Sequence, residues 1–328
     1  MNVNLKIIRL REVEMYTMQV KTFTNKKFVA IIATLCCLLW GSAYPAVKSG
    51  YILFNIGASD VSSKIVFAGY RFTMAGLLVL ILAKAFGQNL FAFSKKSFLN
   101  LVMLGIAQTT LQYIFFYVGL ANTTGVKGSI MNSMGTFFSV FLAHYIYKND
   151  KLNLQKIAGC IVGFIGVMIV NFNADLLNFS FNFKGEGFVI ISSFMFSVAA
   201  IYGKKLTQTM DAMVVTGYSL FMGGALLIFL GTSFGGKVHN FTLSSSLLLG
   251  YMILLSSVAF TLWSLLLKYN KVSSVSVFIF LTPIFGAILS AIFLGENILE
   301  IKNIFALMLV CFGIWIVNKD KNIIKKLR

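Results

Sequence analysis

The sequence predicts an all-α polytopic membrane protein with ten transmembrane helices, arranged as two inverted five-helix repeats. Of its 328 residues, 58% are hydrophobic and only 12% are charged, and the mean hydropathy is +0.85. Water-soluble domains need a more charged surface than this composition supplies. Apolar runs of about 17 to 24 residues recur along the chain, the length of helix that crosses about 30 Å of hydrocarbon. The two halves of the chain also resemble each other in sequence.

The apolar runs are predicted to be helices. Lipid offers no partners to backbone N–H and C=O groups, and the runs lack the alternating pattern of a membrane barrel. A window of about 19 residues locates the runs. Their approximate ranges are 28–47, 64–84, 98–120, 126–147, 154–172, 186–206, 211–232, 246–267, 272–294 and 302–318.

The positive charge of the chain follows its loops. The net charge is +18, from 28 Lys and Arg residues against 10 Asp and Glu residues. If the N-terminus is cytoplasmic, 21 of the basic residues lie inside and six outside, and Arg71 alone lies within a span. Because this bias follows the positive-inside rule, we expect a multi-pass protein of the cell (inner or plasma) membrane with both termini in the cytoplasm. No loop is long enough for a basic domain, so we expect no nucleic-acid partner.

The remaining composition limits the chemistry. All four cysteines lie within spans and the chain has only two histidines, so we expect no disulfide, no metal site and no cofactor. Residues 1–27 form a predicted cytoplasmic N-terminal extension, and residues 319–328 a basic cytoplasmic tail. The extension is either an amphipathic strip on the inner leaflet or sequence upstream of a true start at Met15 or Met18. The run after Lys27 has the length of a span and no cleavage pattern, unlike a signal peptide.

An internal repeat is visible at an offset of 147 residues. Residues 148–171 align with residues 295–318, so that Gly166 to Asn171 match Gly313 to Asn318 without a gap. Each repeat has an odd number of spans, so the second copy enters the membrane from the opposite side. The predicted divisions are a first repeat at 28–172, a linker at 173–185 and a second repeat at 186–318.

Inverted repeats are typical of alternating access, because they allow two arrangements of similar energy, each open to one side. No loop exceeds about 15 residues and no phosphate-binding G-x-x-x-x-G-K-[ST] pattern occurs, which disfavours a nucleotide-driven pump. The acidic residues Glu186, Asp211 and Glu296 lie at span ends, so the chain lacks the constellation of an enzyme. Uniport down a gradient and proton antiport are both open.

Three stretches resemble a known family: "LLWGSAYPAVK", "YRFTMAG" and "FLTPIFGAILSAIFLGENILEIKNIFALMLVCFGIWIV". Over about residues 28–318 the chain resembles the EamA-type branch of the drug/metabolite transporter superfamily. The resemblance implies ten helices in two inverted halves and export of amino acids, drugs or other small metabolites. The sequence departs from the family pattern in its first half, where Thr136 stands opposite Pro283 and Asn149 opposite Glu296. The positions that match the pattern are Trp40, Gly41, Ser42, Lys48, Arg71, Pro283, Gly295 and Glu296.

Four residues are predicted to act as gate or coupling groups: Lys48, Arg71, Pro283 and Glu296. Arg71 lies seven residues into its span, about 10 Å from the outer end. A charge there costs about 2 to 3 kcal/mol unless it is paired, faces water or reaches the headgroups. Arg71 is therefore either a pathway or gate residue, with Glu296 as its partner, or an arginine that extends to the outer headgroups. Glu296 is alternatively a solvated carboxylate at a helix end.

Polar residues recur at helical spacing within three of the spans, 98–120, 126–147 and 246–267. In lipid they must face protein or water, so they either form interhelical hydrogen bonds or line a water-filled cavity. On helix 154–172, Gly159 and Gly163 form a G-x-x-x-G pattern that predicts close packing. The predicted substrate-binding residues are Trp40, Tyr44, Gln108, Gln112, Asn132, Thr136, Tyr202 and Trp263.

The sequence thus predicts a secondary transporter of small organic solutes, such as amino acids, drugs or related metabolites, that exports them by alternating access. The alternative is a membrane-embedded solute-binding sensor or scaffold protein that keeps the transporter fold without moving solute. The expected partners are the solute and the lipid bilayer. A monomer and a homodimer are both open.

Overall fold

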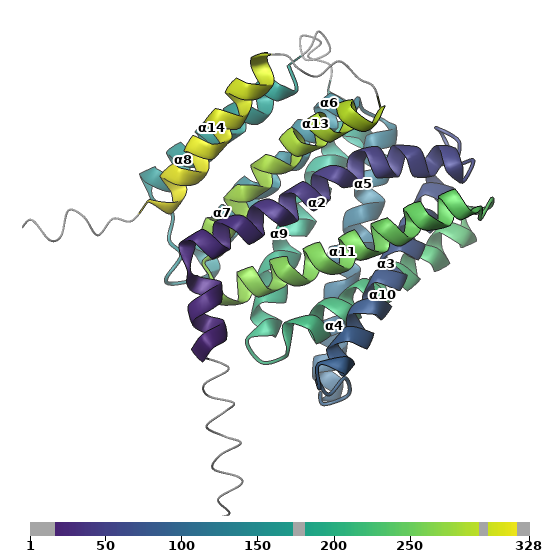
Figure 1. The fold of residues 1–328 in the computed structure, drawn as a ribbon, viewed down its shortest axis with the longest axis horizontal. Helices are drawn as coiled ribbons and strands as arrows, with labels where there is room; N and C mark the ends of the chain where they lie inside the picture. Colours follow the sequence, from purple (N-terminus) through teal and green to yellow (C-terminus); the bar gives the residue numbers. More distant parts are fainter. Residues whose placement is uncertain (1–16, 173–180, 295–300, 320–328) are drawn as a thin grey trace, which may run out of the picture.

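The computed structural model describes residues 17–172, 181–294 and 301–319, and the regular elements in these ranges are helices (Figure 1). Gly295, Glu296 and most of the predicted linker lie outside the described residues. Besides a helical stretch at 17–24, the elements are α2 (Lys26–Leu53), α3 (Val61–Ala85), α4 (Lys95–Gly105), the π-helix η1 (Ile106–Leu111), α5 (Gln112–Ala121), α6 (Gly125–Ser133), α7 (Gly135–Ile146), α8 (Leu154–Val170), the π-helix η3 (Phe183–Gly187), α9 (Phe188–Thr207), α10 (Ala212–Ser233), α11 (Leu243–Tyr269), α12 (Val272–Ser276), the 3₁₀ turn η4 (Val277–Phe280), α13 (Leu281–Leu294) and α14 (Ile301–Asn318).

Each predicted apolar span falls on a helical segment, which confirms the all-helical polytopic class. Within the described residues, seven continuous helical runs are long and apolar enough to cross a membrane. The predicted spans at 126–147, 154–172 and 302–318 instead fall on shorter helices: α6 with α7, α8, and α14. Ten membrane crossings therefore stay a prediction.

Polar caps set the helix starts, several residues before the apolar runs. The Asn25 side chain accepts the backbone N–H groups of Lys27 and Phe28 at the start of α2, and Asp60 accepts that of Ser63 at the start of α3. These bonds satisfy donors that the first helical turn leaves unpaired. α2 and α3 have 28 and 25 residues and extend past their hydrophobic runs at both ends.

Two antiparallel helix pairs lie toward opposite edges of the bundle, α8 with α14 and α3 with α10 (Figure 1). A Cβ on Gly159 would lie 2.7 Å from the Gly313 carbonyl oxygen, and one on Gly166 would lie 2.8 Å from that of Ala306. The predicted close packing at this G-x-x-x-G pattern is confirmed. Gly159 and Ala306, like Gly166 and Gly313, are 147 residues apart, so the crossing is centred on equivalent positions of the repeat.

The centre of the bundle is built by one long helix from each half. α2 packs between α11 and α13, and Figure 1 shows it lying between them. α9 packs against α5 and α7, the corresponding helices of the other half. At the contact of α2 with α13, a Cβ on Gly41 would lie 2.6 Å from Phe285 Cβ, so these two backbones meet closely. Pro45 does not interrupt α2.

Both halves contain a helix break at the same repeat position. α6 ends before Met134, and α13 begins at Leu281, 147 residues later, after the 3₁₀ turn η4. In the second half Pro283 lacks a backbone donor, which favours the altered turn before it. In the first half no proline is needed, because Ser193 Oγ donates to the carbonyls of Met131 and Asn132. The breaks are thus shared although the prolines are not.

Candidate functional site

Four aromatic side chains from α2, α9 and α11 meet in the interior. The ring of Trp40 lies 5.0 Å from Trp263, 5.5 Å from Phe260 and 6.2 Å from Phe196, each in an edge-to-face arrangement. Trp263 is only 4% exposed. Such contacts favour a rigid apolar wall at the meeting point of the helices.

The aromatic wall continues to Arg71 on α3. Phe260 lies 6.0 Å from Phe72, and Phe72 lies 4.4 Å from Tyr113 on α5. The guanidinium carbon of Arg71 lies 4.9 Å from the centre of the Phe72 ring. A cation over an aromatic face is attracted by the ring quadrupole. Trp263 and Arg71 are therefore connected through a continuous set of rings.

Arg71 is buried near the middle of the bundle. Its side chain is 3% exposed, and its Nε donates to Ser256 Oγ at 2.6 Å. Ser256 is the central residue of α11, 13 residues from each end. Arg71 itself is ten residues from the start of α3, about 15 Å, because the helix begins earlier than its hydrophobic run. No ion pair to Arg71 occurs within the described residues.

Tyrosine side chains lie beside the arginine. Tyr113 of α5 lies 4.4 Å from the Phe72 ring and 6.0 Å from Tyr117, measured between ring centres. Tyr51 of α2 packs against the same cluster. Tyr117 is buried and Tyr113 half-buried. Two helices, α2 and α5, thus place tyrosine side chains near one buried cation.

Three predicted site residues have buried polar atoms without a partner in the described part of the chain. They are Nε1 of Trp40, Nε1 of Trp263 and Oε1 of Gln112. Gln112 is 9% exposed and begins α5 directly after the π-helix η1, which contains Gln108. An unpaired buried polar atom costs about 1–3 kcal/mol, so such atoms call for an explanation in a ligand or an ordered water.

Tyr44 of α2 packs against α13. Its ring lies on the backbone of Gly286, where a Cβ would lie 2.9 Å from it. Asn132 lies on α6 just before the break between α6 and α7. Tyr44 therefore joins α2 to α13, the broken helix of the second half.

Comparison with known proteins supplies the family. The model of the EamA-like transporter family matches residues 27–172 and 183–319. The chain belongs to the EamA-like transporter family. It is 27% identical to an uncharacterized transporter of Archaeoglobus fulgidus over 271 residues, which are 81% of this chain and 89% of that protein. It is 23% identical to the uncharacterized transporter YvbV of Bacillus subtilis over 89% of this chain and 92% of that protein.

A solved structure supports the same fold. A crystal structure titled "Crystal structure of protein" aligns with a TM-score of 0.74 at 15% identity, over 90% of this chain and 97% of that one. The family and its relatives point to membrane transport of small solutes by a multi-pass protein of the cell membrane, not to an enzyme.

The remaining predicted site residues of this EamA-family protein lie apart from the aromatic wall. Thr136 is fully buried and its hydroxyl donates to the Ser276 carbonyl at 3.3 Å, which ties α7 to α12. Tyr202 packs in a separate apolar cluster with residues of α3, α4 and α10. Lys48 is exposed on α2, and Pro283 is buried near the start of α13. Their functional roles stay predictions, and Glu296 lies outside the described residues.

Sequence reasoning missed the surroundings of Arg71. Tyr51, Tyr113 and Tyr117 were not singled out, although Tyr113 and Tyr117 are four residues apart on one helix face. Ser256 was missed because the predicted polar stripe of its helix starts one residue later, at Ser257. Ser257 instead donates to the Ala75 carbonyl on α3.

A buried carboxylate lies toward each end of the bundle. Asp150, between α7 and α8, is 1% exposed and accepts Lys156 Nζ at 2.6 Å and the Ser273 backbone N–H at 3.0 Å. Its Oδ1 also accepts the Ser273 hydroxyl. Burial raises the pKa of Asp150, but the hydrogen bonds from Lys156 and Ser273 outweigh it, so its pKa lies below the usual value.

At the opposite end, Glu186 of η3 is 4% exposed. It accepts Thr123 Oγ1 at 2.8 Å and the Asn182 backbone N–H at 2.7 Å, and Lys127 Nζ lies 3.7 Å from its Oε1. Each carboxylate thus joins a residue of one half to a residue of the other.

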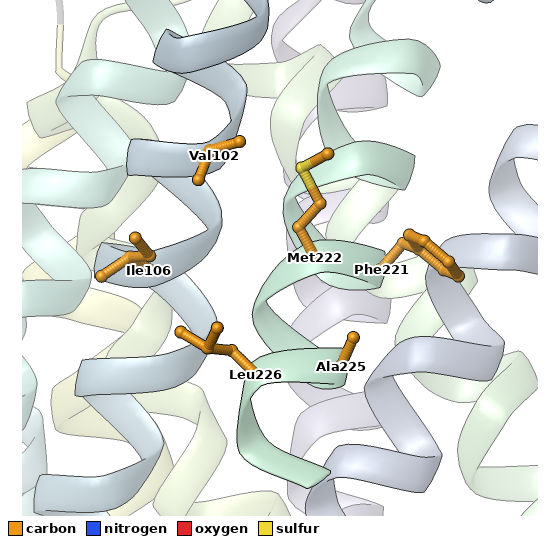
Figure 2. A pocket seen from close by; sticks show the side chains of 6 residues that line it. All are labelled: Val102, Ile106, Phe221, Met222, Ala225 and Leu226. Carbon is orange, nitrogen blue, oxygen red and sulfur yellow. The ribbon is translucent and has the colours of Figure 1, made fainter. Parts of the chain in front are cut away.

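A groove of about 340 Å³ lies outside the site, between α4, η1 and α10 (Figure 2). Figure 2 shows Val102 and Ile106 on one helix and Met222 and Leu226 on the other bordering it. Its lining is wholly apolar, so it suits a lipid acyl chain and offers nothing to a polar solute. The lining residues are Val102, Ile106, Phe221, Met222, Ala225 and Leu226.

Proposed function

We propose that this protein is a secondary transporter that exports small organic solutes by alternating access, with the solute held between the two halves near Trp40, Gln112 and Trp263. The observation that carries the proposal is that buried polar atoms of Trp40, Gln112 and Trp263 have no partner among the described residues, two of them on rings that contact each other. A folded core gains nothing from them, whereas a solute with hydrogen-bonding groups would satisfy them.

Symmetry supports alternating access between two inverted repeats. The family match divides at nearly the predicted boundaries, with residues 27–172 and 183–319. The side chains of Asn171 and Asn318, equivalent at the offset of 147, both donate to the carbonyl four residues earlier. The shared helix breaks at Met134 and Leu281 add a matching flexible point in each half. Two similar halves allow two states of similar energy around one central site.

Charge supports the orientation. The 21 basic residues on one side and six on the other favour ten crossings with both termini in the cytoplasm. In this orientation the Asp150 end is cytoplasmic and the Glu186 end faces outward. Among the described residues, no carboxylate lies beside Arg71 or Trp263. Uniport and proton antiport through a carboxylate at one end of the bundle are therefore both compatible with this site.

The test is flux in proteoliposomes loaded with amino acids and related metabolites, run with and without a pH gradient. Export of at least one solute is the expected result, and dependence on the pH gradient separates antiport from uniport. Saturable solute binding without any flux would overturn transport and favour the alternative of a solute-binding sensor or scaffold.

Site variants test the location of the solute. Gln112→Leu removes an unpaired polar atom at nearly constant size, so we expect unchanged or higher thermal stability and about tenfold lower flux. Trp263→Phe removes the indole N–H together with part of a buried ring, so we expect lower thermal stability as well as about tenfold lower flux. Ser139→Ala is the matched control, because this buried hydroxyl already has a partner in Ser197, so its loss should lower stability by about 1 kcal/mol and leave flux unchanged. Normal flux in Gln112→Leu and Trp263→Phe would contradict the proposed location.

A further inference from the structure

We propose that Arg71 is a binding subsite for a carboxylate, so that the solute is a monoanion, or a zwitterion held by its carboxylate, with an apolar or aromatic body. The inference deepens the proposed function and rests on it, because it names the substrate class of the same interior site. Its test measures binding and can fail or succeed independently of flux.

The first argument is the cost of the charge. A guanidinium at the centre of a membrane span costs about 2.5–3.5 kcal/mol even on the most lenient insertion scale. Only 3% of the Arg71 surface is exposed, and the residue forms no ion pair within the described residues. One hydrogen bond to Ser256 and the face of Phe72 are weak compensation for a full charge. An anion that enters with the solute would supply the missing partner.

The second argument is that the donors around Arg71 exceed the acceptors. A guanidinium has five N–H donors, and only Nε has a side-chain partner in the described part of the chain. Tyr113 lies beside Phe72 and Tyr117 beside Tyr113, and both carry further O–H groups. Farther along the same wall, the indole N–H groups of Trp40 and Trp263 have no partner among the described residues. A carboxylate accepts several hydrogen bonds and donates none, so it complements this set.

The charge of the site selects a monoanion. Arg71 is the one buried cation in the aromatic wall formed by Trp40, Trp263, Phe260, Phe72 and Tyr113. A carboxylate would neutralise it, whereas a phosphate dianion would leave about one negative charge without a partner in a low-dielectric interior. Arg71 also contacts Ser256, the central residue of α11, so it lies near the middle of that helix and not at its end.

The rings define the body of the ligand. Phe72 and Tyr113 lie beside the guanidinium, and Phe260 connects them to Trp40. A ligand whose carboxylate reaches Arg71 would have its next atoms against these rings. An apolar or aromatic body of a few carbon atoms therefore fits better than a polyhydroxylated one.

The test compares acids with their neutral amides, which have the same shape. Binding of phenylacetate, phenylacetamide, hydrocinnamate and hydrocinnamamide is measured on the purified full chain in nanodiscs, by thermal stabilisation and by quenching of tryptophan fluorescence. We expect each acid to bind about ten- to hundredfold more tightly than its amide, the range of one or two charge-assisted hydrogen bonds. Equal affinity of acid and amide in the wild type, or no binding of either acid at millimolar concentration, would overturn the proposal.

Variants separate binding from folding. Arg71→Gln should abolish the preference for the acid, and Arg71→Lys should keep part of it, because the charge remains without the planar fork. Ser257→Ala is the matched control, since this neighbouring buried serine contacts Ala75 and not Arg71. A preference for the acid that survives in Arg71→Gln would contradict the proposal. So would a finding that chloride weakens binding of the acid and of the amide by the same factor. If Arg71→Gln fails to fold, the graded loss in Arg71→Lys decides.

Flux distinguishes this inference from the proposed function. Acid-selective binding without any transport would leave the carboxylate subsite standing and overturn export. Transport of a neutral solute that is unchanged in Arg71→Gln would leave export standing and overturn the subsite.

Discussion

A buried carboxylate joins the two halves of the chain at each end of the bundle, and the two carboxylates differ in the number and the length of their contacts. Asp150 accepts three hydrogen bonds, one of them from the ammonium of Lys156 at 2.6 Å, and two come from Ser273 in the other half of the chain. Glu186 accepts two hydrogen bonds, and its nearest cation, Lys127, lies at 3.7 Å, beyond hydrogen-bonding distance. The Asp150 end is therefore tied more tightly than the Glu186 end.

This difference indicates which end opens more readily. Alternating access requires each end to open in turn, and the end with fewer and longer contacts needs less free energy to do so. Further contacts strengthen the Asp150 end: Lys204 donates to the Asn270 carbonyl and lies 5.3 Å from the Tyr147 ring, and Asn270 donates to the Phe23 carbonyl. In the proposed orientation, the conformation described is the one with its cytoplasmic end more firmly closed.

The largest expected effect comes from breaking the Asp150 tie. Lys156→Met leaves Asp150 buried without its cation, so we expect a loss of about 3–5 kcal/mol in the free energy of unfolding, measured by denaturant titration in detergent. Asp150→Asn strands Lys156 in the same way. The double variant should be less destabilised than the sum of the two single variants, because no unpaired charge remains. Additive effects would show that the pair is not coupled.

A smaller effect is expected at the other end. Glu186→Gln keeps an oxygen acceptor for Thr123 but loses the acceptor of the Asn182 backbone N–H and the longer ion pair to Lys127, so it should lower stability by about 1–2 kcal/mol. Asp60→Asn is the control, since Asn caps a helix as well as Asp does and the site is exposed. A loss in Glu186→Gln as large as that in Lys156→Met would remove the distinction between the ends.

The sequence was informative where local rules apply. Hydrophobic run length placed helices on every predicted span, and the glycine spacing of α8 predicted its close contact with α14. Both depend on residues near one another in the chain. The offset of 147 also aligned two helix breaks, although the first half has Thr136 where the second half has Pro283.

The candidate site was harder to predict, because its contacts join distant residues. Asp150 and Ser273 are 123 positions apart, as shown by their hydrogen bond, and nothing in the loop "KNDK" indicates a buried carboxylate. Arg71 meets Ser256 at a separation of 185 positions. Helical facing also decides the outcome: Trp40 and Trp263 face each other, whereas Tyr202 packs in another cluster.

The smallest expected effect is the response of the Asp150 tie to pH. Because the pKa of Asp150 is lowered in the folded protein, its stabilising contribution is present above the unfolded pKa of about 3.9 and is lost as the pH falls through the folded value. The groups that face it are Lys156, Lys204 and Tyr147. Between about pH 5 and 8, the stability difference between the wild type and Asp150→Asn should therefore stay constant.

In the stability difference between the wild type and Asp150→Asn, the contributions of other titrating groups at this end cancel. His144 Nδ1 accepts the Leu152 backbone N–H in the same loop, but both proteins contain it, so its contribution cancels in the difference. Below about pH 4 the difference should shrink, as Asp150 becomes protonated in the unfolded and then in the folded state. A difference that already shrinks between about pH 8 and 5 would mean that the pKa of Asp150 is not lowered in the folded protein and that Lys156 and Ser273 hold it more weakly than their contacts indicate.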